Sequence, residues 1–278
     1  MEIKMIGCQE MEKNMGWNNL MILGLVAAVL CIAGFYRYVY FMSVGYGFAI
    51  AGIGTALILM FPTERSVVSI LLCGLMILYG IRLAGFLIYR EWKAAEYRKT
   101  LQEVTAGESK MPVGVKILIW IGVSVLYVVQ CSPVFYRMYH AKGSINDAAA
   151  WAGILICAVA IVLESLADKQ KSDQKKRNPD MVAMQGLYRM VRCPNYFGEI
   201  LFWSGLFVSG FSVLQGAGEW CMAVIGYVCI VMIMFSGAKR LEKRQNERYG
   251  KQKNYQEYVQ KTPILIPGIP LYHLNKME

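Results

Sequence analysis

Residues 186–205 read GLYRMVRCPNYFGEILFWSG, so a basic segment leads directly into an apolar run that begins at Pro194. Proline suits the first turn of a helix because its missing N–H has no helical partner there. Arg189 and Arg192 come just before this helix start, where free backbone N–H groups and the helix dipole both favour an anion. The stretch therefore predicts an anion-binding site at a membrane surface.

The same helix start places polar side chains on one face. Asn195, Glu199 and Trp203 recur at intervals of four residues, which aligns them along one side of a helix. Two simpler interpretations stay open: arginines beside membrane helices are commonly topological anchors, and Glu199 can lie at the depth of the lipid headgroups. The crowding of Arg, Asn, Tyr, Glu and Trp into so short a stretch favours a binding site.

The composition sets the class of protein. The chain has 278 residues, of which 56% are hydrophobic, and its mean hydropathy is +0.38. Several runs of about twenty residues lack charge, and each is long enough to cross the apolar core of a bilayer. We therefore expect an all-α, polytopic membrane protein that forms a single integral membrane domain over residues 1–278.

Seven membrane-spanning helices are expected from these runs. They cover residues 17–36, 40–61, 66–89, 112–136, 148–167, 195–214 and 219–237. The first run is longer than the core of a signal peptide and lacks a strongly basic lead, so we interpret it as a retained helix. Residues 17–89 thus form an N-terminal group of three helices, and residues 112–268 hold the later helices and the motifs.

The distribution of Lys and Arg predicts the orientation. Residues 90–112, 168–195 and 238–278 hold 5, 7 and 9 of them, whereas the alternate connectors hold at most 2 each. With seven spans, every rich segment falls on one side, and the positive-inside rule makes that side cytoplasmic. We expect an outside N-terminus, a cytoplasmic C-terminus and a cytoplasmic motif face, in a bacterial inner membrane or an endoplasmic reticulum.

Other functional classes receive less support. The formal net charge is +10, but the cations lie in connectors between apolar runs, which argues against nucleic acid as a partner. The eight cysteines include no C-x-x-C pair, and the chain has two histidines, so no metal site is predicted. The G-x-G within residues 45–54 (GYGFAIAGIG) follows no expected strand, and close packing of helices through small residues explains it better than dinucleotide binding.

Charged residues inside the expected spans are further candidates. Arg82 lies within the third span, where a charge costs about 3 kcal/mol at the bilayer centre unless it finds a partner or extends to the interface. Glu164 and Asp168 lie four residues apart near the end of the fifth span, on one face. Acids at a helix C-terminus oppose the helix dipole, so we expect them to pair with lysine or to bind a ligand.

The predicted topology brings three segments to one face: the end of the fifth span, the RMVRCPNYFGE stretch and the tyrosine-rich tail. Arginine binds phosphate oxygens with two parallel hydrogen bonds, and carboxylates accept hydrogen bonds from ribose hydroxyls. This set of side chains fits a soluble anionic cofactor that meets a lipophilic substrate in the bilayer.

Three motifs resemble one known family. They are residues 186–205, E-x-x-x-D-x-Q-K at residues 164–171, and the closing E-R-Y-G, Y-x-x-Y and T-P-I-L-I-P within residues 247–267. Over residues 80–268 the chain resembles the steroid 5-alpha-reductase C-terminal-domain family, most closely its uncharacterised polytopic branch with the form G-L-W-R-Y-S-R-H-P-N-Y-F-G-E. The resemblance implies a seven-helix membrane oxidoreductase of CH–CH groups, in which NADPH reduces an activated carbon–carbon double bond of a steroid-like or other lipid.

The resemblance also assigns cofactor-binding residues. These are Asp168, Arg189, Arg192, Asn195, Tyr196, Glu199, Trp203, Tyr249, Tyr255 and Tyr258. It implies that Asp168 contacts polar groups of the cofactor, that both arginines contact its phosphates, and that Asn195 and Glu199 hold the nicotinamide or ribose. Trp203 would line the pocket, and the three tail tyrosines would lie at the adenine end.

Two departures from the family pattern bear on the chemistry. Cys193 replaces the usual histidine of R-H-P-N-Y, although the steroid reductases themselves lack that histidine. No Asp or Glu lies within the first three expected spans, where the steroid reductases carry an acid that polarises the substrate ketone. Tyr46, Tyr79 and Tyr89 are candidate proton donors, but tyrosines in membrane helices are commonly interface anchors, so the donor is left unassigned.

Two other functions stay open. The isoprenylcysteine carboxyl methyltransferases share an R-H-P-x-Y-x-G stretch and a charged tail but bind S-adenosylmethionine; the ADKQK and N-x-x-G-E motifs favour the reductase. A non-catalytic scaffold or a transporter is the third interpretation. Transporter sites usually lie near the membrane midplane, whereas the polar residues here gather at one predicted face.

Overall fold

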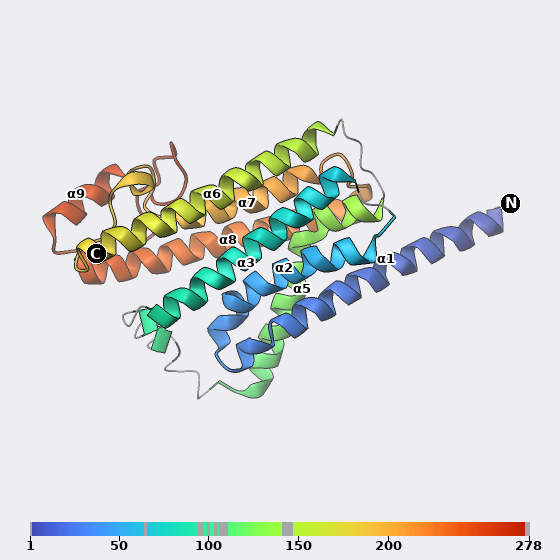
Figure 1. The fold of residues 1–278 in the computed structure, drawn as a ribbon, viewed down its shortest axis with the longest axis horizontal. Helices are drawn as coiled ribbons and strands as arrows, with labels where there is room; N and C mark the ends of the chain where they lie inside the picture. The colour runs from blue at the N-terminus through green and yellow to red at the C-terminus, as the bar shows by residue number, and fades with distance from the viewer. Residues whose placement is uncertain are drawn as a thin grey trace. The chain divides into compact units, whose positions relative to one another are not determined.

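A computed structural model describes residues 2–63, 66–93, 97, 98, 101, 102, 105, 111–140 and 147–275, with side chains from residue 16 onward. All the regular elements in these residues are helical, which confirms the all-α class (Figure 1). The α-helices are α1 (Glu2–Leu30), α2 (Val44–Met60), α3 (Val67–Lys93), α5 (Val113–Tyr139), α6 (Ala148–Arg177), α7 (Pro194–Ser209), α8 (Gly216–Tyr249) and α9 (Lys253–Lys261). Short 3-10 helices are η1 (Ile32–Phe35), η2 (Tyr38–Met42) and η4 (Gly186–Arg189).

Five of the described helical segments are long and apolar enough to cross a membrane. They are Tyr38–Met60, Val67–Lys93, Val113–Tyr139, Ala148–Arg177 and Gly216–Tyr249. The first and sixth expected spans appear as shorter helices, namely the apolar stretch Gly16–Leu30 of α1 and the 16-residue α7. The chain is thus an integral membrane protein, and its orientation in the membrane stays a prediction.

The helix ends differ from the expected ones in two ways. Helix α1 ends at Leu30 rather than near residue 36, and the chain turns through η1 and η2 instead. Helices α6 and α8 continue well past their apolar runs, because ADKQKSDQKKR and AKRLEKRQNERY contain neither Gly nor Pro to stop them. The view of Glu164 and Asp168 as acids at a helix C-terminus is therefore wrong, since α6 continues to Arg177.

The chain forms two compact units. Unit 1 comprises Met1–Trp151 and Ser209–Gly226, and unit 2 comprises Ala152–Val208 and Tyr227–Glu278. Helices α6 and α8 each begin in unit 1 and continue into unit 2. All the residues that the family resemblance assigns to the cofactor belong to unit 2.

Unit 1 is built on a close glycine contact between α2 and α3. A Cβ atom placed on Gly47 would lie 2.7 Å from the carbonyl oxygen of Gly80, and one on Gly80 would meet the carbonyl of Gly47 in turn. Two turns further along α2, a Cβ on Gly54 would lie 3.0 Å from the Cys73 carbonyl. The expectation that the G-x-G stretch packs helices together is confirmed.

Polar contacts join the α1–α2 connector to the end of α3. Arg37 donates to Glu91 at 2.6 Å, and the Tyr40 hydroxyl donates to the same carboxylate at 2.7 Å. Spans that alternate in direction bring these two segments to one side of the membrane. The contacts agree with the grouping of connectors that the charge distribution predicts.

A second polar cluster in unit 1 joins connectors of the opposite group. The buried Arg137 donates to Asp147 at 2.7 Å, and Ser212 donates to the same carboxylate at 2.6 Å. Nearby on the same helices, His140 hydrogen-bonds Glu219 at 2.9 Å. These residues lie at the end of α5 and near the starts of α6 and α8, which the predicted topology places on one side of the membrane. The contacts within unit 1 therefore agree with the predicted alternation of connectors between the two sides.

Candidate functional site

Unit 2 brings α6 and α7 into very close contact. A Cβ on Gly205 would lie 2.6 Å from the Cys157 sulfur and 2.8 Å from the Gly153 carbonyl, so a larger residue has no room there. Two turns closer to the start of α7, Gly198 meets the side chain of Glu164. The interface therefore places the polar residues of α6 directly against those of α7.

Asp168 and Asn195 are joined across this interface. The Asn195 amide Nδ2 donates to Asp168 Oδ1, and the Tyr188 hydroxyl donates to Asn195 Oδ1 at 2.9 Å. The Tyr258 hydroxyl then donates to the Tyr188 carbonyl at 2.6 Å. A chain of hydrogen bonds thus runs from α6 through α7 and η4 to α9.

Two further carboxylates lie buried at the same interface. Glu164 and Glu199 are 2% and 7% exposed, and Asp168 is 8% exposed. The Trp203 Nε1–H donates to Glu199 Oε1 at 3.4 Å, which confirms that residues 199 and 203 share a face of α7. Buried carboxylates are costly in a membrane protein, so three of them on two adjacent helices are a functional candidate.

The loop before α7 is held by two glutamines of α6. Gln170 Oε1 accepts from the Leu187 N–H at 2.8 Å, and Gln174 Oε1 accepts from the N–H groups of Met184 and Gln185 at 2.9 Å. Gly186 has a φ of +68°, and a Cβ there would collide with Gln170, so glycine is required on both counts. These contacts fix the position of η4 and hence of Tyr188.

The two arginines before α7 have different environments. Arg189 is exposed, and its guanidinium makes no hydrogen bond or ion pair with the residues that the structure describes. Arg192 is 2% exposed and donates to Glu242 at 2.8 Å and to the Tyr272 carbonyl. Arg192 therefore links the start of α7 to α8 and to the C-terminal segment, and Arg189 is the arginine that a soluble ligand can reach.

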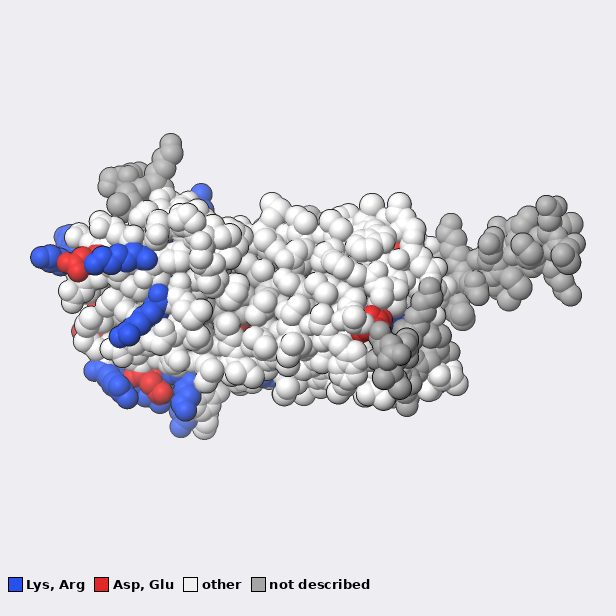
Figure 2. Space-filling view, turned by 90° about the horizontal axis from the view of Figure 1, so that it is seen from above, with Lys and Arg blue, Asp and Glu red and all other residues white. Residues whose placement is uncertain are grey.

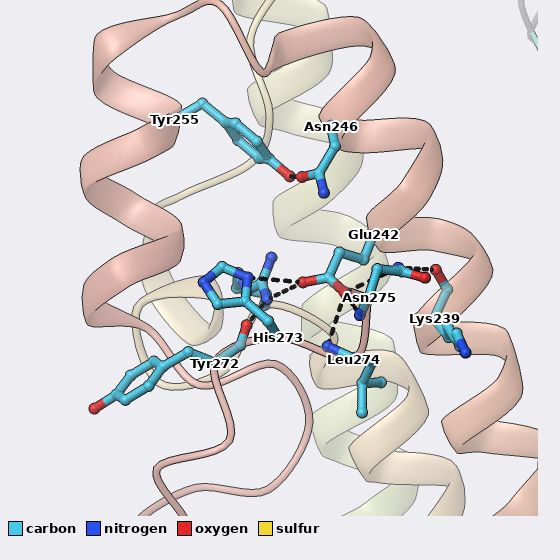
Figure 3. A network of polar contacts seen from close by, with 9 residues as sticks. Lys239, Glu242, Asn246, Tyr255, Tyr272, His273, Leu274 and Asn275 are labelled. Atoms are coloured by element: carbon cyan, nitrogen blue, oxygen red, sulfur yellow. Dashed lines mark hydrogen bonds and ion pairs between the residues drawn. The ribbon is translucent and has the colours of Figure 1, made fainter. Parts of the chain in front are cut away.

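Glu242 is hydrogen-bonded to the C-terminal segment, including Leu274 and Asn275 (Figure 3). One carboxylate oxygen accepts from the backbone N–H groups of Leu274 and Asn275, both at 2.9 Å. The other oxygen lies 3.2 Å from His273 Nδ1. The backbone N–H of Arg192 also donates to the Pro263 carbonyl at 2.9 Å, so residues 263–275 are fastened to the start of α7.

The tail tyrosines are occupied by protein contacts. Lys175 donates to the Tyr249 hydroxyl at 2.6 Å, which joins α8 to α6, and the Tyr255 hydroxyl donates to Asn246 at 2.6 Å. Burial raises the pKa of Tyr255 to about 12 and also raises the pKa of Tyr258. These tyrosines hold α9 in place, and their assignment to the adenine end stays a prediction.

Tyr196 and Cys193 belong to an apolar cluster. Tyr196 packs on Gly237 of α8, where a Cβ would lie 3.4 Å from its ring. Cys193 is 5% exposed and lies with Ile264 and other apolar side chains. Burial raises the pKa of the Cys193 thiol to about 12, so this thiol stays neutral and does not replace an imidazole as an acid near pH 7.

The candidate proton donors lie in unit 1. The Tyr46 and Tyr79 hydroxyls are 3.3 Å apart, and both side chains are buried, at 6% and 0% exposure. Tyr89 is 58% exposed, as expected for an interface anchor. Arg82 is half-buried on α3. Among the described residues, no group of three or more His, Cys, Asp or Glu is placed to hold a metal ion.

The sequence pattern did not single out Tyr188 or Glu242. Glu242 looks like one more charge in a charged tail, but it recurs four residues after the buried Ala238 and seven before the buried Tyr249, which marks the inward face of α8. Tyr188 carried no such signal, because its partners lie on α6, α7 and α9 and most are distant in the sequence.

Comparison with known proteins places the chain in a family. No match was found among curated proteins or among solved structures. A family model described as "Protein of unknown function (DUF1295)" matches residues 19–262. These residues include the second half of α1, all of α2 to α9, and Glu164, Asp168, Asn195 and Glu199. The chain therefore belongs to this family of proteins of unknown function, DUF1295.

Proposed function

We propose that the protein is a membrane-embedded reductase that uses NADPH to reduce an activated carbon–carbon double bond of a lipophilic substrate. The observation that carries the proposal is the polar row on α6 and α7, formed by the buried Glu164, Asp168 and Glu199 and the half-buried Asn195. Membrane helices seldom bury several acids for stability alone, because each acid costs free energy in an apolar surrounding. A ligand that uses these groups gives a reason for their presence.

The donor and acceptor set suits a nicotinamide dinucleotide. Carboxylate oxygens of Asp168 and Glu199 accept from ribose hydroxyls or from the nicotinamide amide, and the Asn195 amide offers both donor and acceptor. Arg189, the exposed last residue of η4, supplies a bidentate contact to a phosphate. When bound, NADPH supplies the hydride, and the protein groups named here bind and orient it on the predicted cytoplasmic face.

The environment of Arg192 indicates that the two arginines before α7 have different roles. Its guanidinium is buried against Glu242 and the Tyr272 carbonyl, so we assign it to positioning the start of α7. The phosphate contact that the family resemblance gives to both arginines then falls to Arg189. The two residues are therefore expected to respond differently to substitution.

A ligand titration tests the proposal. Thermal unfolding of the detergent-purified protein is followed with NADPH, NADH and S-adenosylmethionine, each titrated separately. A ligand at 100 times its Kd adds about 2.7 kcal/mol to the free energy of unfolding, so selective stabilisation by NADPH is the expected result. Stabilisation by S-adenosylmethionine alone would assign a methyltransferase, and no response to any of the three would remove the support for a cofactor enzyme.

A matched pair of arginine variants locates the phosphate contact. Arg189→Gln is expected to weaken NADPH binding about tenfold to a hundredfold, as loss of one charge-assisted contact implies. Arg177→Gln removes an exposed arginine from the end of α6 and should leave the Kd unchanged. Equal Kd values for Arg189→Gln and the wild type would contradict the placement of the phosphate.

A further inference from the structure

Helix α8 carries an exposed stripe that changes from apolar to basic along its length. Val228 and Met232 are 45% and 64% exposed, and Ser236, Lys239 and Lys243 continue the exposed side. At 3.6 residues per turn these five positions fall within about 80° of one another around the helix. The face of α8 that meets lipid chains therefore continues directly as a basic face.

Two arginines widen the basic part of this stripe. Arg240 and Arg244 are exposed and flank Lys239 and Lys243 on the next helical row. Glu242, three residues after Lys239, lies at the buried edge of the same turns, where it is 1% exposed. Lys239, Arg240, Lys243 and Arg244 together form the basic stripe of α8.

The basic stripe has no acidic partner among the residues that the structure describes. Two other exposed cations of unit 2 do have one: Lys176 lies 4.0 Å from Asp173, and Arg248 lies 4.0 Å from Asp180. Figure 2 shows Lys and Arg, with a few Asp and Glu among them, gathered over the end of unit 2 that carries α9, beside a surface almost without charge. The four cations of the basic stripe outnumber the one exposed acid of the same helical stretch, Glu247, so this surface carries a net positive potential.

The depth of the stripe matches a phospholipid headgroup. Helical rise is 1.5 Å per residue, so Lys239 and Lys243 lie roughly 3 and 9 Å along the axis beyond Gly237, where the apolar run of α8 ends. The polar headgroup layer of a leaflet adds only about 5–7 Å to the apolar core on each side. The stripe thus begins where lipid phosphates lie and extends just past them.

From this placement we infer that the basic stripe of α8 binds the headgroups of anionic phospholipids in the adjacent leaflet. The chemistry is contact of guanidinium and ammonium groups with lipid phosphates, supported by the apolar stripe that holds the acyl chains alongside. The inference is independent of the proposed reductase activity. It differs from a general orienting role of positive charge, because it requires these four side chains and a negatively charged lipid.

The test compares two lipid compositions and two charge-matched variants of the full chain. The wild type is placed in nanodiscs of phosphatidylcholine and in nanodiscs of an equal mixture with phosphatidylglycerol. Thermal unfolding and the number of phosphatidylglycerol molecules retained in native mass spectrometry are measured. The stripe variant carries Lys239→Gln, Arg240→Gln, Lys243→Gln and Arg244→Gln. The control carries Arg177→Gln, Lys251→Gln, Lys253→Gln and Lys261→Gln, all at exposed positions outside the stripe.

We expect phosphatidylglycerol to stabilise the wild type and the control. The preference of the stripe variant for phosphatidylglycerol over phosphatidylcholine should fall at least about tenfold, because each cation near a charged membrane raises the binding constant about fivefold. Equal losses in both variants would overturn the inference in favour of non-specific attraction. A wild type indifferent to phosphatidylglycerol would overturn it as well. Stabilisation by inorganic phosphate in phosphatidylcholine discs, to the same extent, would assign the stripe to a soluble anion instead. All the substitutions are at exposed positions, and unchanged helical circular dichroism checks that both variants fold.

Discussion

Units 1 and 2 differ in the kinds of side chain that they bury between their helices. The interior of unit 1 is formed by apolar side chains and by glycine contacts such as Gly47 with Gly80, and its ion pairs lie at helix ends and connectors. Unit 2 instead buries Glu164, Asp168 and Glu199 in the interface of two helices. Glycine contacts bring the helices together in both units, so the acids of unit 2 are an addition that packing does not require.

The difference teaches which residues to test for function. Glu242 is surrounded by a cation and backbone donors, namely Arg192, Leu274 and Asn275. At the α6–α7 interface, Asp168 accepts a hydrogen bond from the Asn195 amide, and Glu199 accepts one from the Trp203 Nε1–H. We expect the first arrangement to matter for stability, and we propose that the second serves a ligand.

The largest effect is expected at Glu242. Glu242→Ala leaves the Arg192 guanidinium buried without its carboxylate, which typically costs about 3–5 kcal/mol. The free energy of unfolding, measured by denaturant titration in mild detergent, should fall accordingly. Glu257→Ala, at an exposed position of α9, is the control and should change it by less than about 0.5 kcal/mol. Equal free energies of unfolding for the two variants would show that the contacts of Glu242 with Arg192 and with residues 273–275 do not stabilise the protein.

Asp147 gives unit 1 a pH-dependent contribution. Burial acts to raise the pKa of Asp147, but hydrogen bonds from Ser212, the Ala150 N–H and Arg137 outweigh it and lower this pKa below its ordinary value. The stabilisation is therefore present above the unfolded pKa of about 3.9 and is lost as the pH falls through the lower folded value. Asp147→Asn should cost about 1.5–3 kcal/mol at pH 7. Below about pH 4, the free energy of unfolding of this variant should fall less steeply with decreasing pH than that of the wild type. An unchanged pH dependence in this range would contradict the role of Asp147.

A glycine pair tests the packing of unit 1. Gly80→Ala directs a methyl group at the Gly47 carbonyl and should cost about 1–3 kcal/mol by overpacking. Gly85 lies on the same helix, and no atom lies within 4 Å of the place that its Cβ would take, so Gly85→Ala should be neutral or stabilise by up to about 1 kcal/mol. Comparison of the two unfolding free energies isolates the close contact from helix propensity.

The sequence was sufficient to predict the features that depend on local spacing. The apolar runs predicted the helices, the small residues at 45–54 predicted a close helix contact, and the four-residue spacing placed Glu164 with Asp168 and Glu199 with Trp203. Partners distant in the chain were not predictable in the same way. Glu242 and Arg192 are hydrogen-bonded although they are 50 residues apart in the chain. The polar extensions of α6 and α8 were also missed, because the expected spans were bounded by hydropathy, and hydropathy does not show whether a polar segment contains Gly or Pro to end a helix.

The central claim is that the polar row of α6 and α7 serves a ligand rather than the fold. The most direct measurement uses a variant with Asp168→Leu, Asn195→Leu and Tyr188→Phe, which replaces the hydrogen-bonded chain by apolar groups. Replacing a buried polar set in this way is often neutral or stabilising, so the unfolding temperature without ligand should be unchanged or higher, and the stabilisation by NADPH should disappear. A variant that unfolds readily, or one that still responds to NADPH like the wild type, would contradict the claim.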